Sequence, residues 1–165
     1  MAYLSKGLQE RATAYATAHG LELEYSLGGG KDGNVYSTSA QTAIKVFWQP
    51  ETFRRERWCY ERLKEMDVVE VLGHNVPRLR GVDEARQIIE ITIVPPPYLL
   101  DFASAYLDYP PDFPDEVIEE WQHAKHDEFG EHWGTVLVML KVLEEEYGIF
   151  MLDVHPGNIA FETPD

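Results

Sequence analysis

The chain has 165 residues, of which 44% are hydrophobic and 12% are aromatic, and its formal net charge is -15 at pH 7. This composition suits one domain with a hydrophobic core. The single cysteine, Cys59, excludes an internal disulfide framework and favours a reducing compartment, so we expect a cytoplasmic protein. Apolar runs stay shorter than the roughly 18 residues that a membrane-spanning helix needs, so no membrane span is expected.

The N-terminal part of the sequence predicts one helix followed by three strands. A helix over 3–19 is expected because apolar residues recur near one face and Gly20 follows as a stop. The residues on that face are Leu4, Leu8, Ala12, Tyr15 and Ala16. A half-buried strand is expected over 21–27, where apolar and polar residues alternate. Its apolar face comprises Leu21, Leu23, Tyr25 and Leu27. Further strands are expected at 34–38 and 42–48.

A glycine-rich loop joins the first two of these strands. Its G-x-G-x-x-G pattern is made by Gly28, Gly30 and Gly33. A backbone that folds over phosphates must come close to them with its N–H groups free, and a Cβ would hinder that approach. Lys45, on the third strand, supplies a positive charge for phosphate oxygens. The glycine pattern alone also fits a plain hairpin turn, but Val35 and the sequence Ala43-Ile44-Lys45 favour phosphate binding.

This strand–loop–strand arrangement, followed by Ala-Ile-Lys, resembles the nucleotide-binding hairpin of the protein-kinase family. In that family a glutamate on the next helix pairs with the lysine and holds it extended toward phosphate. A helix is expected over 51–66, where Glu56 matches that glutamate and Glu61 is the second choice. The simpler alternative is that Glu56 only balances the arginines beside it on a wet helix face. The resemblance implies ATP binding by Gly28, Gly30, Gly33, Val35, Ala43, Lys45 and Glu56.

Two further strands, at 78–82 and 87–94, would complete a five-stranded antiparallel sheet, the small lobe of a kinase-like α+β fold. Pro95, Pro96 and Pro97 then form a stiff linker. In the family this hinge offers a backbone N–H to adenine, and three prolines remove three donors, so adenine recognition of the usual kind is not expected. The expected organisation is a single kinase-like domain over 1–165. Its parts are a small lobe with its N-terminal helix at 1–94, a hinge at 95–98 and a minimal helical large lobe at 99–165.

Helices dominate the expected large lobe. A short helix is predicted at 98–107, an acidic helix at 115–129 and a longer one at about 131–147. The last is expected to bury Trp133, Val136, Leu137, Leu140 and Leu143. The histidines of this region raise the hypothesis of a zinc site, although no H-E-x-x-H motif is present and solvated side chains are the simpler explanation. These histidines are His123, His126 and His132.

Acidic residues concentrate in the C-terminal part of the chain. Residues 1–100 hold 13 Asp and Glu against 12 Lys and Arg, a net of -1, whereas residues 101–165 hold 16 against 2, a net of -14. Such a surface should repel nucleic acid and anionic membranes, so neither is expected as a partner. It could attract a basic protein partner, and a merely soluble acidic face is the simpler alternative.

A second motif, D-V-H-P-G-N, runs from Asp153 to Asn158. It resembles the catalytic loop of kinases and, in its His-Pro-Gly-Asn sequence, the aminoglycoside-phosphotransferase branch of that superfamily. The resemblance implies that Asp153 orients an acceptor hydroxyl and takes its proton, and that the side-chain oxygen of Asn158 binds Mg²⁺. An ordinary Asx-Pro-Gly turn is the alternative. The position of the motif after a long helix, downstream of the glycine loop, favours the catalytic loop.

The sequence departs from this family in two ways. The histidine that precedes the catalytic aspartate by two residues is replaced by Met151. The family also has a second metal-binding aspartate further along the chain, whereas only Glu162 and Asp165 are acidic after Asn158. The resemblance covers about 21–161, so we expect a minimal or C-terminally truncated member of the superfamily.

These features predict ATP-dependent phosphoryl transfer to a hydroxyl on a protein or a small molecule. Because the second metal-binding aspartate is missing, Mg²⁺ binding and turnover are expected to be weak. The alternative is a catalytically inactive pseudokinase scaffold that binds a protein partner through its acidic helical lobe. The two hypotheses differ in whether a second metal-binding carboxylate lies near Asn158.

Overall fold

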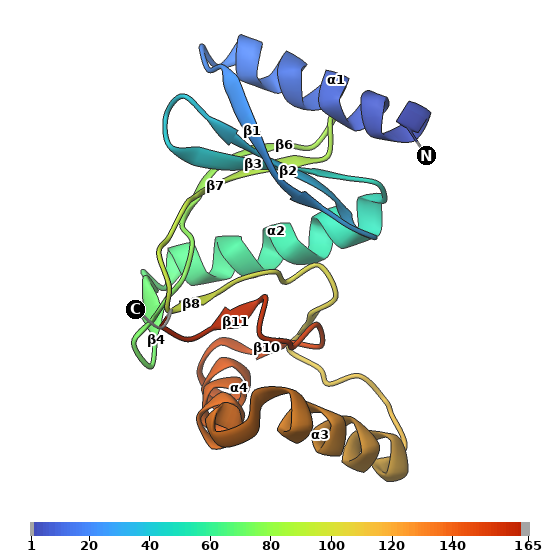
Figure 1. Ribbon diagram of the computed structural model, residues 1–165, viewed down its shortest axis with the longest axis vertical. Helices are drawn as coiled ribbons and strands as arrows, with labels where there is room; N and C mark the ends of the chain where they lie inside the picture. The colour runs from blue at the N-terminus through green and yellow to red at the C-terminus, as the bar shows by residue number, and fades with distance from the viewer. Residues whose placement is uncertain (1, 163–165) are drawn as a thin grey trace.

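The computed structural model describes residues 2–162, with side chains from Lys6 onward. A sheet lies between two helices in the upper half of the molecule, and a smaller helical part lies below it (Figure 1). The long helices are α1 (Ala2–Ala18), α2 (Pro50–Glu65), α3 (Asp115–Phe129) and α4 (Trp133–Tyr147). The predicted α+β class, with a five-stranded antiparallel sheet and a minimal helical lobe, is confirmed. Asp165, considered above as a metal ligand, lies outside the described residues.

The sheet has the strand order β1-β2-β3-β7-β6, and all neighbouring strands are antiparallel. Its strands are β1 (Leu23–Gly29), β2 (Gly33–Thr38), β3 (Thr42–Phe47), β6 (Leu79–Asp83) and β7 (Ile88–Thr92). Every residue of β3 is buried, because α1 covers one face of the sheet and α2 the other (Figure 1). Side chains alternate along a strand. Ile44 and Val46 therefore pack with α1, whereas Ala43 and Phe47 pack on the α2 side, toward which Lys45 also points.

Helix α1 covers the sheet with the face predicted from its apolar spacing. The buried residues of that face are Leu8, Ala12, Tyr15 and Ala16. The side chain of Leu4 lies outside the described ones. The Tyr15 hydroxyl donates a hydrogen bond to the buried carboxylate of Glu90 on β7 at 3.0 Å, which ties the helix to the middle of the sheet.

Strand β1 is more exposed than predicted. Tyr25 is 71% exposed and Leu27 is 52% exposed, although the alternation placed both on a buried face. β1 is an edge strand, and its pairing with β2 shifts register between Leu23 and Ser26 and again between Ser26 and Gly28. Each shift interrupts the strict alternation of faces, so sequence spacing alone misplaces these side chains.

Residues 98–107 do not form the short helix predicted for them. The region contains two short strands, β8 (Tyr98–Leu99) and β9 (Tyr106–Leu107). Their partners are two equally short strands near the C-terminus, β10 (Ile149–Phe150) and β11 (Ile159–Ala160). β8 pairs with β11 and β9 with β10, so partners distant in sequence replace local helical hydrogen bonds. Asp101 has a φ of 74°, which a right-handed helix does not allow. β8 also joins β5 (His74–Asn75) and β4 (Glu70–Val71) in a four-stranded sheet.

The two C-terminal helices lie close to their predicted positions. α3 has the predicted bounds, and a 3₁₀ turn, η1 (Gly130–His132), separates it from α4, which starts at Trp133. The buried face of α4 comprises Trp133, Val136, Met139, Leu140 and Leu143. Leu137 was predicted to be buried but is 40% exposed, because it lines a groove between the two helices. Within residues 2–162, no helix combines the length and apolarity needed to cross a membrane.

Candidate functional site

Lys45 and Glu56 form a buried ion pair between the sheet and α2. The Nζ atom of Lys45 lies 2.7 Å from Oε2 of Glu56, and both side chains are almost completely buried. Burial by itself would lower the pKa of Lys45, but the charges of Glu56 and Asp101 raise it above its ordinary value, so the ammonium stays charged. Burial raises the pKa of Glu56 to about 7, although the Lys45 ammonium acts in the opposite direction.

Glu56 does not act as a surface counter-charge for the arginines beside it. Arg55 pairs with Glu51 at 2.8 Å, and Arg57 pairs with Glu61 at 2.8 Å. Glu61, the second choice for the lysine partner, is therefore engaged along its own helix. Glu56 is 1% exposed and faces the lysine of β3.

The three glycines of the G-x-G-x-x-G pattern lie at the end of β1, in the turn and at the start of β2, and they have different surroundings. At Gly33 the φ angle is 154°, and a Cβ would overlap the carbonyl oxygen of Val46 on β3. A Cβ on Gly28 or Gly30 would meet no heavy atom within 4 Å. The turn is held by the Gly30 N–H, which donates to the Gly33 carbonyl at 3.0 Å, and by the Trp48 indole N–H, which donates to the Gly30 carbonyl at 3.3 Å. Gly33 is therefore required by close backbone packing as well as by its φ angle.

A cavity of about 360 Å³ lies under this loop, between the sheet and the segment that follows β8. Its walls are mostly apolar, and its apolar lining includes Leu27, Val35, Ala43, Ile91 and Leu100. Lys45, Glu56 and Asp101 form its charged end. Apolar walls suit a flat ring, and a fixed cation at one end suits an anionic group, so the cavity combines the two features that a nucleotide requires.

The D-V-H-P-G-N motif folds into a tight turn. The N–H groups of Asn158 and Ile159 both donate to the His155 carbonyl at 2.9 Å, and the Gly157 N–H donates to Nδ1 of the same histidine at 3.0 Å. The Asn158 side-chain nitrogen donates to the carbonyl oxygen of Asp153 at 3.0 Å. The His155 ring also lies near Asp153, with 3.6 Å between Nε2 and Oδ1. The turn thus holds Asp153 and Asn158 beside each other. Forming an ordinary turn therefore does not exclude that this segment is a catalytic loop.

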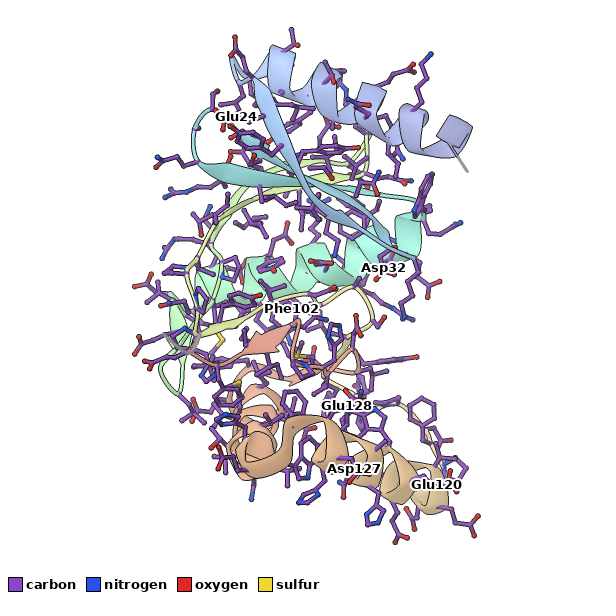
Figure 2. All side chains as sticks on the ribbon, in the orientation of Figure 1. Glu24, Asp32, Phe102, Glu120, Asp127 and Glu128 are labelled. Atoms are coloured by element: carbon purple, nitrogen blue, oxygen red, sulfur yellow. The ribbon has the colours of Figure 1, made fainter. Side chains whose placement is uncertain are left out.

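Three carboxylates from distant parts of the chain meet between the glycine loop and this turn. They belong to Asp32, Asp101 and Asp153, and one oxygen of each lies within 4.8 Å of the others. Asp32 lies between the sheet and the helical part in Figure 2. Among the described residues, this is the only group of three or more His, Cys, Asp or Glu side chains close enough to share a metal ion. Burial raises the pKa of Asp32, Lys45 opposes this shift, and the other two carboxylates add to it.

Of these three aspartates, the sequence motifs predicted only Asp153 as a site residue. Asp32 occupies a variable position of the glycine pattern, and Asp101 lies in a segment whose local pattern predicted a helix. Neither position carries a local sequence signal. Only the pairing of β8 with β11 places Asp101 near the turn that contains Asp153.

The proline linker makes hydrogen bonds to the neighbouring strand β5 through its carbonyl groups. The side-chain nitrogen of Asn75 donates to the Pro95 carbonyl at 3.0 Å, and its backbone N–H donates to the Pro97 carbonyl at 2.8 Å. These two carbonyls therefore face β5. Proline has no backbone N–H, so residues 95–97 cannot donate a backbone hydrogen bond to a ligand.

The histidines considered for zinc do not converge. His132 stacks on Phe161 with 3.9 Å between ring centroids. His74 contacts the same phenylalanine edge-on at 4.8 Å. His123 and His126 lie along α3 and are exposed. No group of metal-binding side chains that includes a histidine is found within residues 2–162.

Comparisons with known proteins add a likeness of fold. No model of a known protein family matches the chain, and neither does any curated protein. A chain of the streptomycin-ATP-APH(2")-IIa ternary complex is similar to it, with 14% sequence identity and a TM-score of 0.44. The similarity covers 90% of this chain and 41% of that chain, so the present chain spans less than half the length of this structural relative. The sequence identity and the TM-score are both low, so the geometry of the described residues has to indicate the function. The five-stranded antiparallel sheet and the smaller helical part define an α+β fold.

Proposed function

We propose that the chain binds ATP between the glycine loop and the catalytic turn and transfers its terminal phosphoryl group to a hydroxyl on a protein or a small molecule. The observation that carries this proposal is the Lys45–Glu56 ion pair at the charged end of the cavity. Burying an ion pair is costly, and well-packed apolar residues would stabilise the fold as well or better. A cation held extended beside an apolar cavity is explained by an anionic ligand.

The cavity and the loop divide the nucleotide between them. The base lies against the apolar walls that include Val35 and Ala43. The loop containing Gly28, Gly30 and Gly33 covers the phosphates with backbone N–H groups other than that of Gly30, which donates to the Gly33 carbonyl. Lys45 binds phosphate oxygens, and Glu56 holds the lysine in place.

The donor set near the phosphates fits Mg²⁺, which prefers hard oxygen ligands. Carboxylates of Asp32 and Asp101 would hold the ion. The amide oxygen of Asn158, whose side chain is bonded to the backbone of Asp153, would be a further ligand. The Asn158 side-chain nitrogen is engaged by the Asp153 carbonyl, so its oxygen points the other way. Magnesium, when bound, neutralises phosphate charge. Kinases carry a second metal-binding aspartate further along the chain than the asparagine of the catalytic loop. Asp101 would take the place of that aspartate here.

Asp153 would act on the acceptor. Its carboxylate receives a hydrogen bond from the acceptor hydroxyl and takes that proton as the hydroxyl oxygen bonds to the terminal phosphorus and the bond to ADP breaks. His155, 3.6 Å away, helps to hold the carboxylate in position. Asp101 also contacts Lys45 at 3.4 Å, so it must release the lysine before a phosphate can bind there. We therefore expect turnover below the roughly 1–100 per second that is typical of kinases.

The test is ATP binding and turnover by purified protein. Calorimetry should show ATP binding that Mg²⁺ strengthens, and ADP release should fall to background in Asp153→Ala while ATP still binds. Asp127→Ala is the matched control, because Asp127 is an exposed aspartate on α3 (Figure 2). Wild-type protein that binds no ATP with or without Mg²⁺ would refute the proposal and favour the inactive scaffold.

A further inference from the structure

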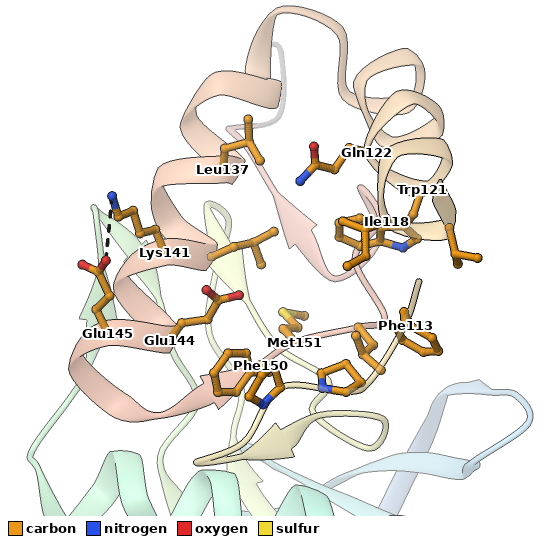
Figure 3. A pocket seen from close by; sticks show the side chains of 15 residues that line it. Phe113, Ile118, Trp121, Gln122, Leu137, Lys141, Glu144, Glu145, Phe150 and Met151 are labelled. Atoms are coloured by element: carbon orange, nitrogen blue, oxygen red, sulfur yellow. Dashed lines mark ion pairs between the residues drawn. The ribbon is translucent and has the colours of Figure 1, made fainter. Parts of the chain in front are cut away.

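An apolar groove of about 720 Å³ runs between α3 and α4, apart from the nucleotide cavity (Figure 3). Its floor is formed by Phe150 and Met151, from the segment that leads to Asp153. The apolar side chains of its walls include Phe113, Val117, Ile118, Trp121, Leu137 and Leu140. We call this surface the α3–α4 groove.

The groove exposes apolar side chains as a continuous surface. Phe113, Val117 and Leu137 are 45%, 46% and 40% exposed, and they come from three different segments of the chain. Single exposed apolar residues are common on protein surfaces, but a contiguous apolar hollow marks a binding surface. The helices on either side give it the shape that receives a third helix.

The charge around the groove is strongly negative. Residues 115–147 hold 10 Asp and Glu against 2 Lys, a net of -8. Both lysines already lie near an acidic partner, since Lys125 is 3.1 Å from Glu128 and Lys141 is 3.8 Å from Glu145. In Figure 2, Glu120, Asp127 and Glu128 lie along α3. A ligand of this surface must therefore bring positive charge.

Glu144 places one of these negative charges at the groove itself. It lines the groove, and no ion pair to it occurs among the described residues. Partial burial raises the pKa of Glu144, and the charge of Glu145 acts in the same direction. A cation beside Glu144 would relieve both effects.

We propose that the α3–α4 groove binds an amphipathic helix of a partner protein, with apolar side chains facing the groove and Lys or Arg along one edge. The apolar walls receive the apolar face, and Glu144 pairs with the basic edge. The acidic surroundings exclude nucleic acid and anionic membrane, and two copies of a chain with a net charge of -15 repel each other. The groove lies outside the ATP cavity, so this binding does not depend on the proposed phosphoryl transfer.

The first test uses a synthetic helical peptide of about four turns, with Leu at i, i+3, i+4 and i+7 and Lys or Arg beside that stripe. Fluorescence anisotropy measures its affinity. Leu137→Asp should weaken binding about ten-fold or more, because a central apolar contact is replaced by a charge. Val138→Asp is the matched control: Val138 is the next residue of the same helix, is 53% exposed and does not line the groove, so affinity should stay within about two-fold.

The second test concerns charge. A peptide with Gln in place of every Lys and Arg should bind about ten-fold more weakly, and added salt should weaken the basic peptide but not the Gln peptide. Glu144→Gln should reduce affinity for the basic peptide more than Glu120→Gln, since Glu120 does not line the groove. Lys45→Met should leave peptide binding unchanged, even if ATP binding is lost or never present.

Three results would overturn the inference. Equal peptide affinity for Leu137→Asp and Val138→Asp, with both variants folded by circular dichroism, would place the peptide elsewhere. Equal affinity for the basic and Gln peptides would show that charge plays no part. A dimer in sedimentation equilibrium that Leu137→Asp dissociates would show that the occupant is a second copy of the chain.

Discussion

Asp101 and Lys45 are 56 residues apart in sequence, yet Oδ1 of Asp101 lies 3.4 Å from Nζ of Lys45. The contact joins the segment after β8 to the central strand of the sheet at the charged end of the cavity. The same carboxylate lies near those of Asp32 and Asp153. Asp101 therefore has two possible cationic partners, the lysine and a metal ion, and the balance between them leads to the first prediction.

Asp101→Asn should reduce the effect of Mg²⁺ on ATP affinity. The variant loses a carboxylate from the proposed metal site and also frees Lys45 from a competing anion. We expect the ratio of ATP dissociation constants without and with Mg²⁺ to fall about three- to ten-fold, since charged hydrogen bonds contribute roughly 1.5–3 kcal/mol and the loss is partly offset. Titration calorimetry at two Mg²⁺ concentrations measures this ratio. Asp112→Asn is the control, and an unchanged ratio in Asp101→Asn would remove Asp101 from the metal site.

Lys45→Met should lower ATP affinity by about ten- to a hundred-fold, because a charge-assisted contact of roughly 1.5–3 kcal/mol is lost. The change also leaves Glu56 buried without its partner, so the variant should be less stable. Thermal unfolding separates the two effects, and Lys64→Met, on an exposed position of α2, is the control. A folded Lys45→Met protein that binds ATP as tightly as wild type would contradict the proposed role.

Gly33→Ala should destabilise the protein, whereas Gly30→Ala should not. A Cβ at Gly33 meets the Val46 carbonyl oxygen, while a Cβ at Gly30 meets open space. We expect a loss of about 2 kcal/mol or more for Gly33→Ala, from backbone strain and steric overlap. Denaturant unfolding of both variants measures the difference. Similar unfolding free energies for the two would mean that the loop does not pack on β3 in this way.

Glu56 should make stability fall as the pH rises. Burial holds the pKa of Glu56 at about 7 in the folded protein, above its ordinary value of 4.5, so the folded state binds this proton more tightly than the unfolded state. The contribution is fully present below pH 4.5 and is lost as the pH rises through about 7. The melting temperature of wild type, minus that of Glu56→Gln, should therefore decrease between these two pH values. An increase would show that the Lys45 ammonium outweighs burial.

Local patterns in the sequence determined much of the fold and part of the candidate site. Apolar spacing along 3–19 and about 131–147 predicted α1 and α4, because a helix places residues three and four apart on one face. The resemblance to kinases predicted Glu56 as the partner of Lys45, and Nζ of Lys45 lies 2.7 Å from Oε2 of Glu56. Their roles toward a nucleotide remain predictions, as do those of Asp153 and Asn158.

Only the tertiary structure decided the remaining features. The segment 98–107 forms strands because its partners are β10 and β11, and local propensity contains no information about partners so distant. The same pairing brings Asp101 to Asp32 and Asp153, so no spacing in the sequence could predict that cluster. Leu137 satisfied the apolar pattern of α4 but lines a groove, because a pattern shows which residues share a face and packing decides whether that face is covered.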